Sequence, residues 1–254
     1  MPKIISYNVN GLRAALRKGL GPWLLSANPD VFCIQEIKAT PDQIDATFLN
    51  ECGYNNYWNP AEKKGYSGVA IFTKEAPQHV ETGCGISKYD CEGRVLRVDF
   101  KDYSVLNVYM PSGTSGEVRQ QFKYEWLDDF YHYLIDLSKK HPHLIITGDF
   151  NICHRPIDIH NPVANARTTG FLPAERDWME KLFNSGFIDT FRHFNKEPHN
   201  YTWWSTRLNA RERNLGWRID YQVATAQMEN RLKRAVILPD AKHSDHCPTL
   251  LEII

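Results

Sequence analysis

Short apolar runs recur along the chain, and polar side chains follow where several of them end. Runs of this length, rich in Ile and Val, predict buried β-strands. Ligands of open α/β sheets collect beyond the carboxyl ends of strands, so these polar groups could converge on one cleft, although any single one could simply cap a strand. The runs and the residues after them are 4–7 with Asn8, 31–34 with Gln35 and Glu36, 105–108 with Tyr109, and 144–147 with Asp149 and Asn151.

Amphipathic segments between these runs predict helices. Over 117–140 an apolar stripe has roughly helical spacing, which predicts a helix packed on the core. Thr40-Pro41-Asp42-Gln43 has the form of a capping box with proline at the first helical position, and Gly53 can end the helix that follows. Pro173–Phe183 predicts another amphipathic helix. The stripe consists of Val118, Phe122, Trp126, Phe130, Leu134 and Leu137.

Two further segments, 219–224 and 249–254, predict strands, which makes more strands than one short parallel sheet would use. We therefore expect two stacked sheets covered by helices in a mixed α/β fold. No Gly/Ser-rich linker, low-complexity tract or repeat divides the 254 residues, so a single domain over 1–254 is expected. The longest irregular stretches, 59–68 and 153–170, are interpreted as functional loops within it.

Composition narrows the class of protein. With 42% hydrophobic residues the chain can bury a substantial core. Its six cysteines are scattered without C-x-x-C pairs, which favours reduced structural thiols in an intracellular protein, in the cytoplasm or nucleoid if bacterial. A strand that begins by Ile4 leaves no room for a secretion signal, and no apolar run is long enough to span a membrane.

The formal net charge of zero does not indicate nucleic-acid binding, but arginines are concentrated in one segment. They fall among tryptophans, a mixture suited to phosphate contact and to stacking on bases or sugars. A solvated charged loop beside core aromatics is the alternative interpretation. The arginines are Arg207, Arg211, Arg213 and Arg218, and the tryptophans are Trp203, Trp204 and Trp217.

Two short motifs point to a reaction. Gly148-Asp149-Phe150-Asn151 places an acid and an amide after a strand, and Asp245-His246 places a carboxylate directly before an imidazole. An acid can hold a hard cation or position water, an amide can orient a phosphate oxygen, and a histidine can stabilise developing charge. Together the motifs suggest metal-assisted hydrolysis of a phosphate ester.

An ordered series of motifs extends these observations. The motifs are Ser6-Tyr7-Asn8-Val9-Asn10-Gly11-Leu12-Arg13, Gln35-Glu36-Ile37-Lys38, Gly148-Asp149-Phe150-Asn151, Asn209-Ala210-Arg211, Gly216-Trp217-Arg218-Ile219-Asp220-Tyr221 and Ser244-Asp245-His246-Cys247-Pro248. From residue 3 to the C-terminus the series resembles the exonuclease III family of apurinic/apyrimidinic endonucleases. The resemblance implies a DNase I-like fold of the endonuclease/exonuclease/phosphatase superfamily, a four-layered α/β sandwich of two stacked mixed β-sheets flanked by helices. It also implies Mg²⁺-dependent incision of double-stranded DNA 5′ to an abasic site, which leaves a 3′-hydroxyl, together with 3′-end trimming and 3′–5′ exonuclease activity. We expect the protein to be a monomer.

The resemblance further implies a cation site. Glu36 would be the main ligand, with Asn10 beside it at a position where relatives vary between Asp and Asn. Mg²⁺ prefers oxygen ligands and keeps several waters, so few protein ligands suffice, and Mn²⁺ could substitute for it. The other expected ligands are Asp149, Asn151, Asp245 and His246.

Catalytic roles follow from the same resemblance. Asp149 would orient the attacking water or accept its proton, while Asn8 and Asn151 hold the water and the phosphate. His246 would contact a non-bridging phosphate oxygen or lie near the nucleophile, with Asp220 fixing its tautomer and favouring the imidazolium. Whether Asp149 or His246 activates the water stays open at this level.

Other matched positions concern the leaving group and the DNA. Tyr109 would bind phosphate or help the 3′-oxygen leave, or would pack as an ordinary aromatic residue at a strand end. Asp245 would support the leaving group directly, through water or through a second metal. Asn165 would contact the target phosphate, whereas Thr168 stands where many relatives carry another asparagine.

The resemblance also implies a small apolar pocket for the lesion. A flipped-out sugar without a base could enter it, whereas an attached base should clash; ordinary core aromatics are the alternative. Arg207 and Arg218 would hold flanking phosphates, and Arg207 and Ser115 stand where some relatives insert side chains into DNA. The pocket residues are Trp203, Trp217 and Ile219.

Two other functions stay open. Another phosphodiesterase or phosphatase of the same superfamily, acting for example on an inositol phosphate or lipid, would use the same hydrolytic residues, although the Trp217 motif favours DNA. A non-catalytic DNA-binding module needs Lys and Arg rather than a row of metal-compatible acids, so it is disfavoured by the presence of Glu36, Asp149, Asp220 and His246. The expected partner is therefore duplex DNA with abasic sites or blocked 3′ ends.

Overall fold

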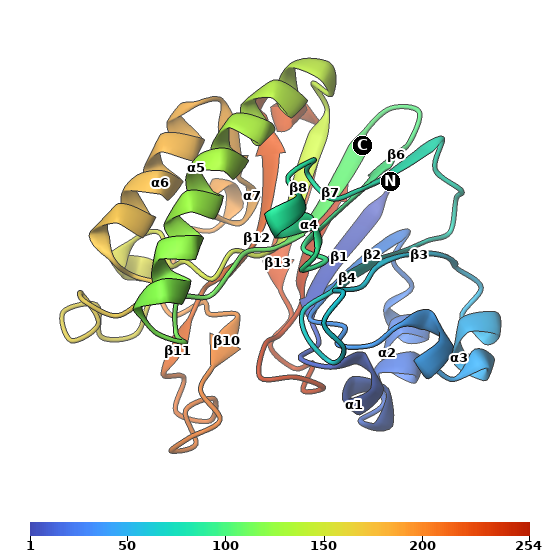
Figure 1. The fold of residues 1–254 in the computed structure, drawn as a ribbon, viewed down its shortest axis with the longest axis horizontal. Coiled ribbons are helices and arrows are strands. Elements are labelled where there is room, and N and C mark those ends of the chain that lie inside the picture. The colour runs from blue at the N-terminus through green and yellow to red at the C-terminus, as the bar shows by residue number, and fades with distance from the viewer.

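Two mixed β-sheets of six strands each form the centre of the molecule (Figure 1). The computed structural model describes the backbone of residues 1–254 and the side chains of all but residues 46, 49 and 50. In order of pairing, the first sheet consists of β13 (Leu232–Ile237), β14 (Thr249–Ile253), β1 (Lys3–Asn8), β2 (Val31–Gln35), β4 (Val69–Thr73) and β3 (Asn55–Asn59). The second consists of β5 (His79–Thr82), β6 (Val95–Asp99), β7 (Ser104–Tyr109), β8 (Leu144–Asp149), β12 (Asp220–Thr225) and β9 (Phe187–Asp189).

Strand directions bring the expected polar ends together. In each sheet two neighbouring strands are parallel, β1 with β2 and β7 with β8, and the other pairs are antiparallel. Since parallel neighbours end at the same edge, each sheet presents a pair of carboxyl ends there. A separate hairpin pairs β10 (Trp203–Trp204) with β11 (Gly216–Trp217) at that end of the molecule.

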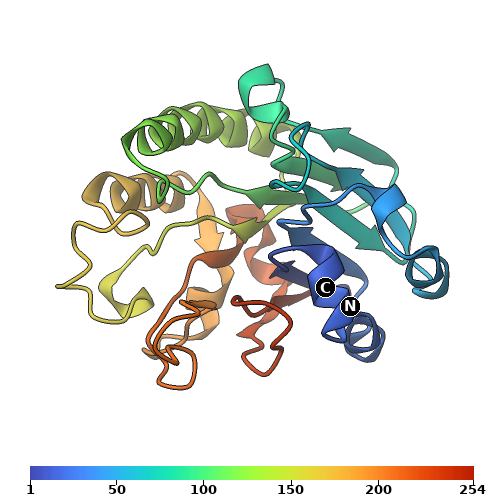
Figure 2. The same cartoon turned by 60° about the horizontal axis from the view of Figure 1, so that its bottom comes forward.

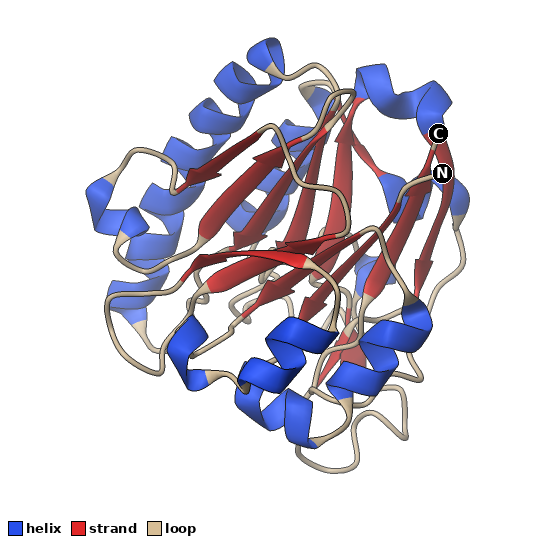
Figure 3. Ribbon diagram, turned by 90° about the vertical axis from the view of Figure 1, so that its right-hand side faces the viewer, coloured by secondary structure: helices blue, strands red, loops and turns tan.

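Helices cover the outer faces of both sheets (Figure 3). The second sheet is covered by α5 (Glu117–Lys140) and α6 (Pro173–Asn184), and the first by α1 (Leu12–Arg17), α2 (Leu20–Ala27) and α3 (Ala46–Glu51). The other helical segments are α4 (Ser87–Asp90), α7 (Thr190–Phe194) and 3₁₀ turns at Pro41–Gln43, Pro156–Asp158 and Ala226–Arg231. Two mixed sheets flanked by helices were expected from the sequence, and this four-layered arrangement is confirmed.

The apolar runs are continuous because both faces of each sheet are covered. Ile4 and Ile145 pack in the cluster between the two sheets. One residue further on, Ile5 packs against the helices outside the first sheet and Ile146 against those outside the second. Successive strand residues point to opposite faces, so a strand buried on both sides needs apolar residues at every position.

Buried amides join the two sheets. Gln35 of β2 donates from Nε2 to Asn107 Oδ1 of β7 at 2.7 Å and to Ser6 Oγ of β1 at 2.9 Å. Asn107 donates from Nδ2 to the carbonyls of Ile34 at 3.0 Å and Ala70 at 2.9 Å. A buried polar group without a partner is costly, so these bonds favour one alignment of the sheets. That alignment places the ends of β1 and β2 beside those of β7 and β8.

The predicted helices over 117–140 and 173–183 are confirmed by α5 and α6, with one error in the stripe. Val118 is 86% exposed, so its assignment to the core was wrong. It lies in the first turn of α5, whereas the buried residues of that helix begin at Lys123. The strands predicted over 219–224 and 249–254 are confirmed by β12, which begins and ends one residue later, and by β14, which ends one residue earlier.

The single helix predicted between Thr40 and Gly53 was wrong. The capping box is present, with the Thr40 N–H donating to Gln43 Oε1 at 3.2 Å, but it caps only a 3₁₀ turn. Ile44 then adopts an extended backbone and packs in the core, which interrupts the helix. Helical structure resumes at α3, where the Asp45 side chain caps the helix by accepting from the Thr47 N–H at 2.8 Å.

No helix among the described residues is both long enough and apolar enough to cross a bilayer. Cys33, Cys153 and Cys247 are buried free thiols, as expected for structural cysteines. The irregular stretches 59–68 and 153–170 contain little regular structure, and the second of them supplies part of the cavity described next.

Candidate active site

Residues from both sheets line a cavity of about 330 Å³ at the carboxyl ends of the parallel strands. This is the lower edge of Figure 1, which turns toward the reader in Figure 2. The convergence expected from the strand ends is therefore observed. The expected site residues that line the cavity are Glu36, Tyr109, Asp149, Asn151, Trp203, Trp217, Ile219, Asp245 and His246.

An unusual backbone conformation aims several of these side chains. Asn10, Glu36, Lys38 and Asn151 all have positive φ, between 46° and 52°. Residues other than glycine seldom adopt this left-handed region, and those that do gather at functional sites. Each of the four follows the end of a strand, so the reversal interrupts the sheet alternation; Glu36 and Asn151 line the cavity, and Lys38 and Asn10 contact each other beside it.

Gly148 lets the strand that carries Asp149 approach its neighbour. Its φ is 142°, and a Cβ at this position would lie 1.9 Å from the Val108 carbonyl oxygen on β7. Only glycine fits such a contact between backbones. Asp149 consequently lies directly beside Tyr109 in the parallel register of β7 and β8.

Three potential ligand side chains face one another in the cavity. Single ligand atoms of Glu36, Asp149 and His246 all lie within 4.8 Å of one another. Asn8 donates from Nδ2 to Glu36 Oε1 at 2.9 Å and to Asp149 Oδ2 at 2.8 Å, which fixes the two carboxylates relative to each other. Carboxylate oxygens in this arrangement fit a hard divalent cation.

Lys38 is a site residue to which the sequence analysis assigned no role. Its Nζ lies 2.8 Å from Glu36 Oε2 and donates to Asn10 Oδ1 at 2.6 Å. Burial opposes ionisation of Glu36, but the charge and hydrogen bond of Lys38, with the Asn8 amide, hold the pKa of this carboxyl below its usual value. Lys38 stood in the motif with Glu36, but its direction depends on the positive φ of both residues.

His246 lies between two acids. Its Nδ1 is 2.9 Å from Asp220 Oδ2, and its Nε2 is 3.9 Å from Asp149 Oδ2. Burial disfavours the charged imidazole, but the charge and hydrogen bond of Asp220, assisted by Asp149, raise the pKa of His246 to about 10. Burial, together with the charge of Asp220, raises the pKa of Asp149 to about 7. The expected partnership of Asp220 with the imidazole is therefore present in the structure.

Tyr109 is held by a buried arginine. The Arg94 guanidinium lies 4.7 Å from the centre of the Tyr109 ring and donates from Nη1 to the Tyr109 carbonyl at 2.9 Å. Burial, with the charge of Glu36, raises the pKa of the Tyr109 hydroxyl well above its usual value. The phenol therefore stays protonated and can act as a hydrogen-bond donor.

Asp245 is a fixed carboxylate. It accepts from Asn10 Nδ2 at 2.9 Å, from Trp203 Nε1 at 3.0 Å and from Ser244 Oγ at 3.1 Å. Burial opposes its ionisation, but the nearby His246 charge and these donors lower the pKa of Asp245. An ionised carboxylate has no proton to give, so its role is positional or electrostatic.

Two tryptophans form an apolar wall of the cavity. Trp203 and Trp217 are direct partners in the β10–β11 pair, and their rings meet edge to face at 90° with centroids 6.0 Å apart. Ile219 packs in the same cluster. Gly170 approaches the wall closely, since a Cβ there would lie 3.0 Å from Trp217 Cζ3. The three expected pocket residues therefore lie together in the cavity with the acids and the histidine.

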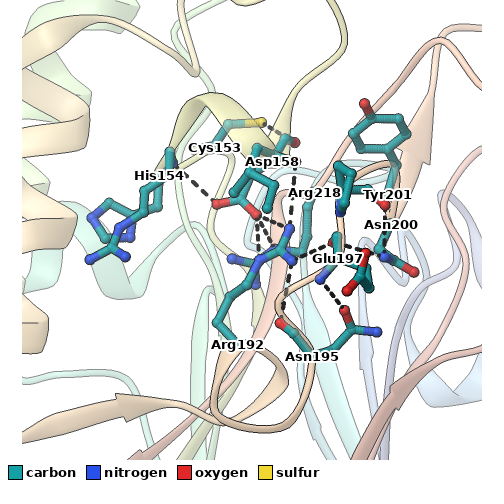
Figure 4. A network of polar contacts seen from close by, with 12 residues as sticks. Cys153, His154, Asp158, Arg192, Asn195, Glu197, Asn200, Tyr201 and Arg218 are labelled. Atoms are coloured by element: carbon teal, nitrogen blue, oxygen red, sulfur yellow. Dashed lines mark hydrogen bonds and ion pairs between the residues drawn. The ribbon is translucent and has the colours of Figure 1, made fainter.

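The expected phosphate contact of Arg218 was wrong. The side chain is buried, and Figure 4 shows it in a network with Asp158 and Arg192. Its Nε donates to Asp158 Oδ1 at 2.8 Å and its Nη2 to Asp189 Oδ2 at 2.7 Å. The carboxylates of Asp158 and Asp189 offset the charge of this guanidinium, because burying an arginine without such partners would cost a large desolvation free energy.

Asn165, Arg207 and Ser115 do not line the cavity. Asn165 donates from Nδ2 to the carbonyls of His160 at 3.1 Å and Asn161 at 3.0 Å, so its amide nitrogen fastens its own loop. Thr168, which lines the cavity, donates from Oγ1 to Asn165 Oδ1 at 3.4 Å. Arg207 and Ser115 are exposed on loops.

A comparison with protein-family models assigns nearly the whole chain to one family. The model described as "Endonuclease/Exonuclease/phosphatase family" matches residues 5–246. The chain belongs to the endonuclease/exonuclease/phosphatase family. It is therefore a hydrolase of this family, and the DNase I-like fold expected from the sequence is confirmed.

Relatives within the family carry nuclease names. An exodeoxyribonuclease of Bacillus subtilis is 41% identical over 253 residues, covering 99% of both chains. The DNA repair nuclease APEX1 of Danio rerio is 38% identical over 252 residues, covering 98% of this chain and 81% of its own. The structure of an AP endonuclease from Archaeoglobus fulgidus matches with a TM-score of 0.90 at 31% identity, covering 100% of this chain and 99% of its own. These likenesses confirm the resemblance to exonuclease III-type AP endonucleases.

Proposed function

We propose that the protein is a Mg²⁺-dependent DNA repair endonuclease. It hydrolyses the phosphodiester 5′ to an abasic site in duplex DNA, leaves a 3′-hydroxyl, and has 3′-end trimming and 3′–5′ exonuclease activity. The observation that carries this proposal is that one cavity holds both the acid–histidine cluster and the apolar Trp203–Trp217 wall. The names of the relatives support it, and one related structure, a 3′ phosphatase from Neisseria (TM-score 0.92, 29% identity, all of both chains covered), is bound to a product DNA hairpin.

The cation is assigned to the carboxylates. Glu36 would be its main ligand, with Asn10 beside it and Asp149 within reach, and Mg²⁺ or Mn²⁺ there would polarise the phosphate and offset its charge. His246 is less suited to be a ligand, because a protonated imidazole has no lone pair to offer. Asp245 does not belong to the group whose ligand atoms lie within 4.8 Å of one another, so it is assigned to holding Trp203 instead.

Asp149 is assigned as the general base for water. The water oxygen forms a bond to phosphorus, its proton passes to Asp149, and the bond between phosphorus and the upstream 3′-oxygen breaks. The departing oxygen takes a proton from Tyr109 or from solvent and becomes the 3′-hydroxyl. Asn8 donates to Asp149 Oδ2, and the Asn151 N–H donates to Asp149 Oδ1 at 2.8 Å, so the carboxylate is held in one orientation. Its pKa of about 7 suits a base that works near neutral pH.

His246 and Tyr109 are assigned to the phosphate. The protonated His246 can donate from Nε2 to a non-bridging oxygen, which stabilises the charge that grows there. Tyr109 keeps its proton and can donate to the phosphate or to the departing 3′-oxygen. Asp220 holds the imidazole from Nδ1, and Asp245 holds the Trp203 ring.

Selectivity is assigned to the Trp203–Trp217 wall with Ile219. A sugar without a base, rotated out of the duplex, could lie against these apolar side chains, whereas an attached base would need additional space. The protein would act on the duplex as a monomer of one domain, with the exposed Arg207 available to contact DNA phosphate.

One assay tests the proposal. Purified protein is given matched duplexes, intact or carrying one abasic analogue, with Mg²⁺ or with EDTA. We expect Mg²⁺-dependent incision of the abasic strand, a product that a polymerase can extend from its 3′-hydroxyl, and loss of activity in Asp149→Asn but not in the exposed control Asp136→Asn. Equal cleavage of both duplexes would contradict the abasic preference. Hydrolysis of an inositol phosphate or lipid phosphodiester with neither duplex cut would support the other branch of the family.

A further inference from the structure

An arginine of the β10–β11 hairpin fastens the loop that carries Asp245 and His246. We call residues 238–248, between β13 and β14, the catalytic loop, and residues 205–215, between β10 and β11, the hairpin loop. Figures 1 and 2 show the hairpin loop in orange beside the catalytic loop in red. Arg211 lies in the hairpin loop, where the sequence suggested phosphate contact, but its side chain turns toward the protein.

Arg211 donates four hydrogen bonds to backbone carbonyls of the catalytic loop. Its Nη1 donates to Ser244 at 2.9 Å and to His246 at 3.4 Å. Its Nη2 donates to Pro239 at 2.9 Å and to Ala241 at 2.6 Å. A guanidinium is planar and carries only donors, so one rigid group holds the loop from its beginning to the histidine.

The guanidinium is itself held in place by the hairpin. It lies 4.7 Å from the ring centre of Trp204, which shares a buried apolar cluster with Ala210 and Cys247. The backbone N–H of Trp204 donates to the Asp245 carbonyl at 3.1 Å. Arg211 therefore strengthens a contact that already joins the hairpin strand to the catalytic loop.

The first sheet supports the same loop at another point. The Tyr7 hydroxyl accepts from the N–H groups of His243 and Ser244, each at 3.1 Å. These two bonds hold the loop before the catalytic pair, whereas Arg211 reaches the His246 carbonyl itself. The two supports are therefore not equivalent, because Arg211 acts on the part of the loop that a backbone bridge between Trp203 and His246 already joins to the pocket.

We propose that Arg211 is a positioning residue that sets the place of the His246 imidazole by clamping the catalytic loop to the hairpin. The proposal rests on the function proposed above. Trp203 Nε1 donates to Asp245 Oδ2, so the clamp makes the pocket wall, Asp245 and His246 one rigid unit. A bound sugar and the imidazole that acts on its phosphate then keep a constant separation, and a misplacement of about 1 Å can cost on the order of 100-fold in rate.

Arg213 supplies a matched control. It lies two residues away in the same loop, carries the same charge, and has an exposed side chain. Arg211→Met and Arg213→Met therefore remove one positive charge each from the same region. Only the first removes the clamp, so a difference between the variants cannot come from net charge.

The experiment compares Arg211→Met, Arg211→Lys, Arg213→Met and the unmodified protein by kcat and KM on the abasic duplex, amide hydrogen exchange at residues 243–247, and thermal midpoint. In Arg211→Met we expect kcat to fall on the order of 10- to 100-fold with KM nearly unchanged, and exchange at 243–247 to accelerate while β8 stays protected. In Arg211→Lys we expect a smaller fall, because one ammonium cannot reach carbonyls at both ends of the loop. In Arg213→Met, which keeps the clamp, we expect unchanged exchange at 243–247, and any loss of a phosphate contact should appear in KM rather than in kcat.

Several outcomes would overturn the clamp. Unchanged kcat in folded Arg211→Met, or a raised KM with constant kcat, would make Arg211 a structural or DNA-contact residue. If Arg211→Met does not fold, Arg211→Lys decides, and wild-type kcat and exchange in that variant would contradict the proposal. The exchange measurement needs no substrate, so it tests the clamp even if the unmodified protein fails to cut abasic DNA, which would instead refute the proposed function.

Discussion

Asp149 and Asp220 are direct partners across the antiparallel β8–β12 ladder, and the imidazole of His246 lies between their carboxylates. Two acids placed opposite each other repel, and that repulsion helps to raise the pKa of Asp149. A protonated histidine between them reduces the repulsion and is stabilised by both. The register of the β8–β12 pair therefore places a carboxylate that can act as a base, Asp149, beside a protonated imidazole, His246.

Because Asp149, Asp220 and His246 act as one unit, we expect coupled losses of activity when they are substituted. Asp149→Asn and His246→Ala should each lower kcat by on the order of 10²- to 10⁴-fold, because each removes a group that acts in the same transition state. The double variant should lose less than the product of the two. Asp220→Asn should be milder, since Asp220 acts through the imidazole. Steady-state and single-turnover rates on an abasic duplex check this, and fully multiplicative losses would show that the residues act separately.

Lys38 predicts a competition for the cation site. Its ammonium lies 2.8 Å from Glu36 Oε2, so a divalent cation that binds Glu36 must share or displace this contact. Lys38→Met should therefore bind Mn²⁺ several-fold more tightly in the absence of DNA, and Glu36→Gln should bind it more weakly. Titration followed by electron paramagnetic resonance gives both affinities. Lys64→Met, which removes an exposed charge, is the control; the same affinity in Lys38→Met as in that control would refute the competition.

The apolar wall predicts where abasic preference resides. Trp217→Ala should lower the ratio of kcat/KM for abasic over intact duplex, because the enlarged space admits a nucleotide with its base or misplaces the bare sugar. Arg207→Ala should weaken binding of both duplexes alike and reduce the salt slope by about one phosphate contact. If Trp203→Ala and Trp217→Ala fold and leave the ratio unchanged, these rings serve only as core.

From the buried network around Asp158 we expect the free energy of unfolding to fall at acid pH. Burial opposes its charge, but Arg218 and Arg192 lower the pKa of Asp158 from 3.8 to about 2. A carboxyl with a lowered folded pKa stabilises the protein fully above its unfolded pKa and loses that stabilisation as pH falls toward the folded value. The contribution is about 2 kcal/mol, lost between roughly pH 4 and pH 2.

Urea unfolding of the protein and of Asp158→Asn at pH 6, 4 and 2 measures that loss. The variant should be less stable at pH 6, because it leaves the buried Arg218 guanidinium with one carboxylate fewer, and the difference between the two proteins should narrow as the pH falls. A constant difference at all three pH values would show that the ionisation of Asp158 does not contribute.

Local pattern was sufficient for much of the architecture. The apolar runs 4–7, 31–34, 105–108 and 144–147 became central strands, and α5 and α6 lie where helical spacing predicted them. The motifs around Asp149 and Asp245-His246 indicated hydrolysis before any contact was known. These features depend on residues near one another in the chain, where side-chain period, capping and turn preference act.

Burial and long-range pairing decided what the sequence left open. Arg207, Arg211 and Arg218 look alike in the chain, but one is exposed, one clamps a loop, and one is sealed between Asp158 and Asp189. Asp220 and Asp149 are 71 residues apart, yet the β8–β12 register makes them neighbours. The state of an ionisable group depends on the charges and the loss of water around it, and those arise only when distant segments pack together.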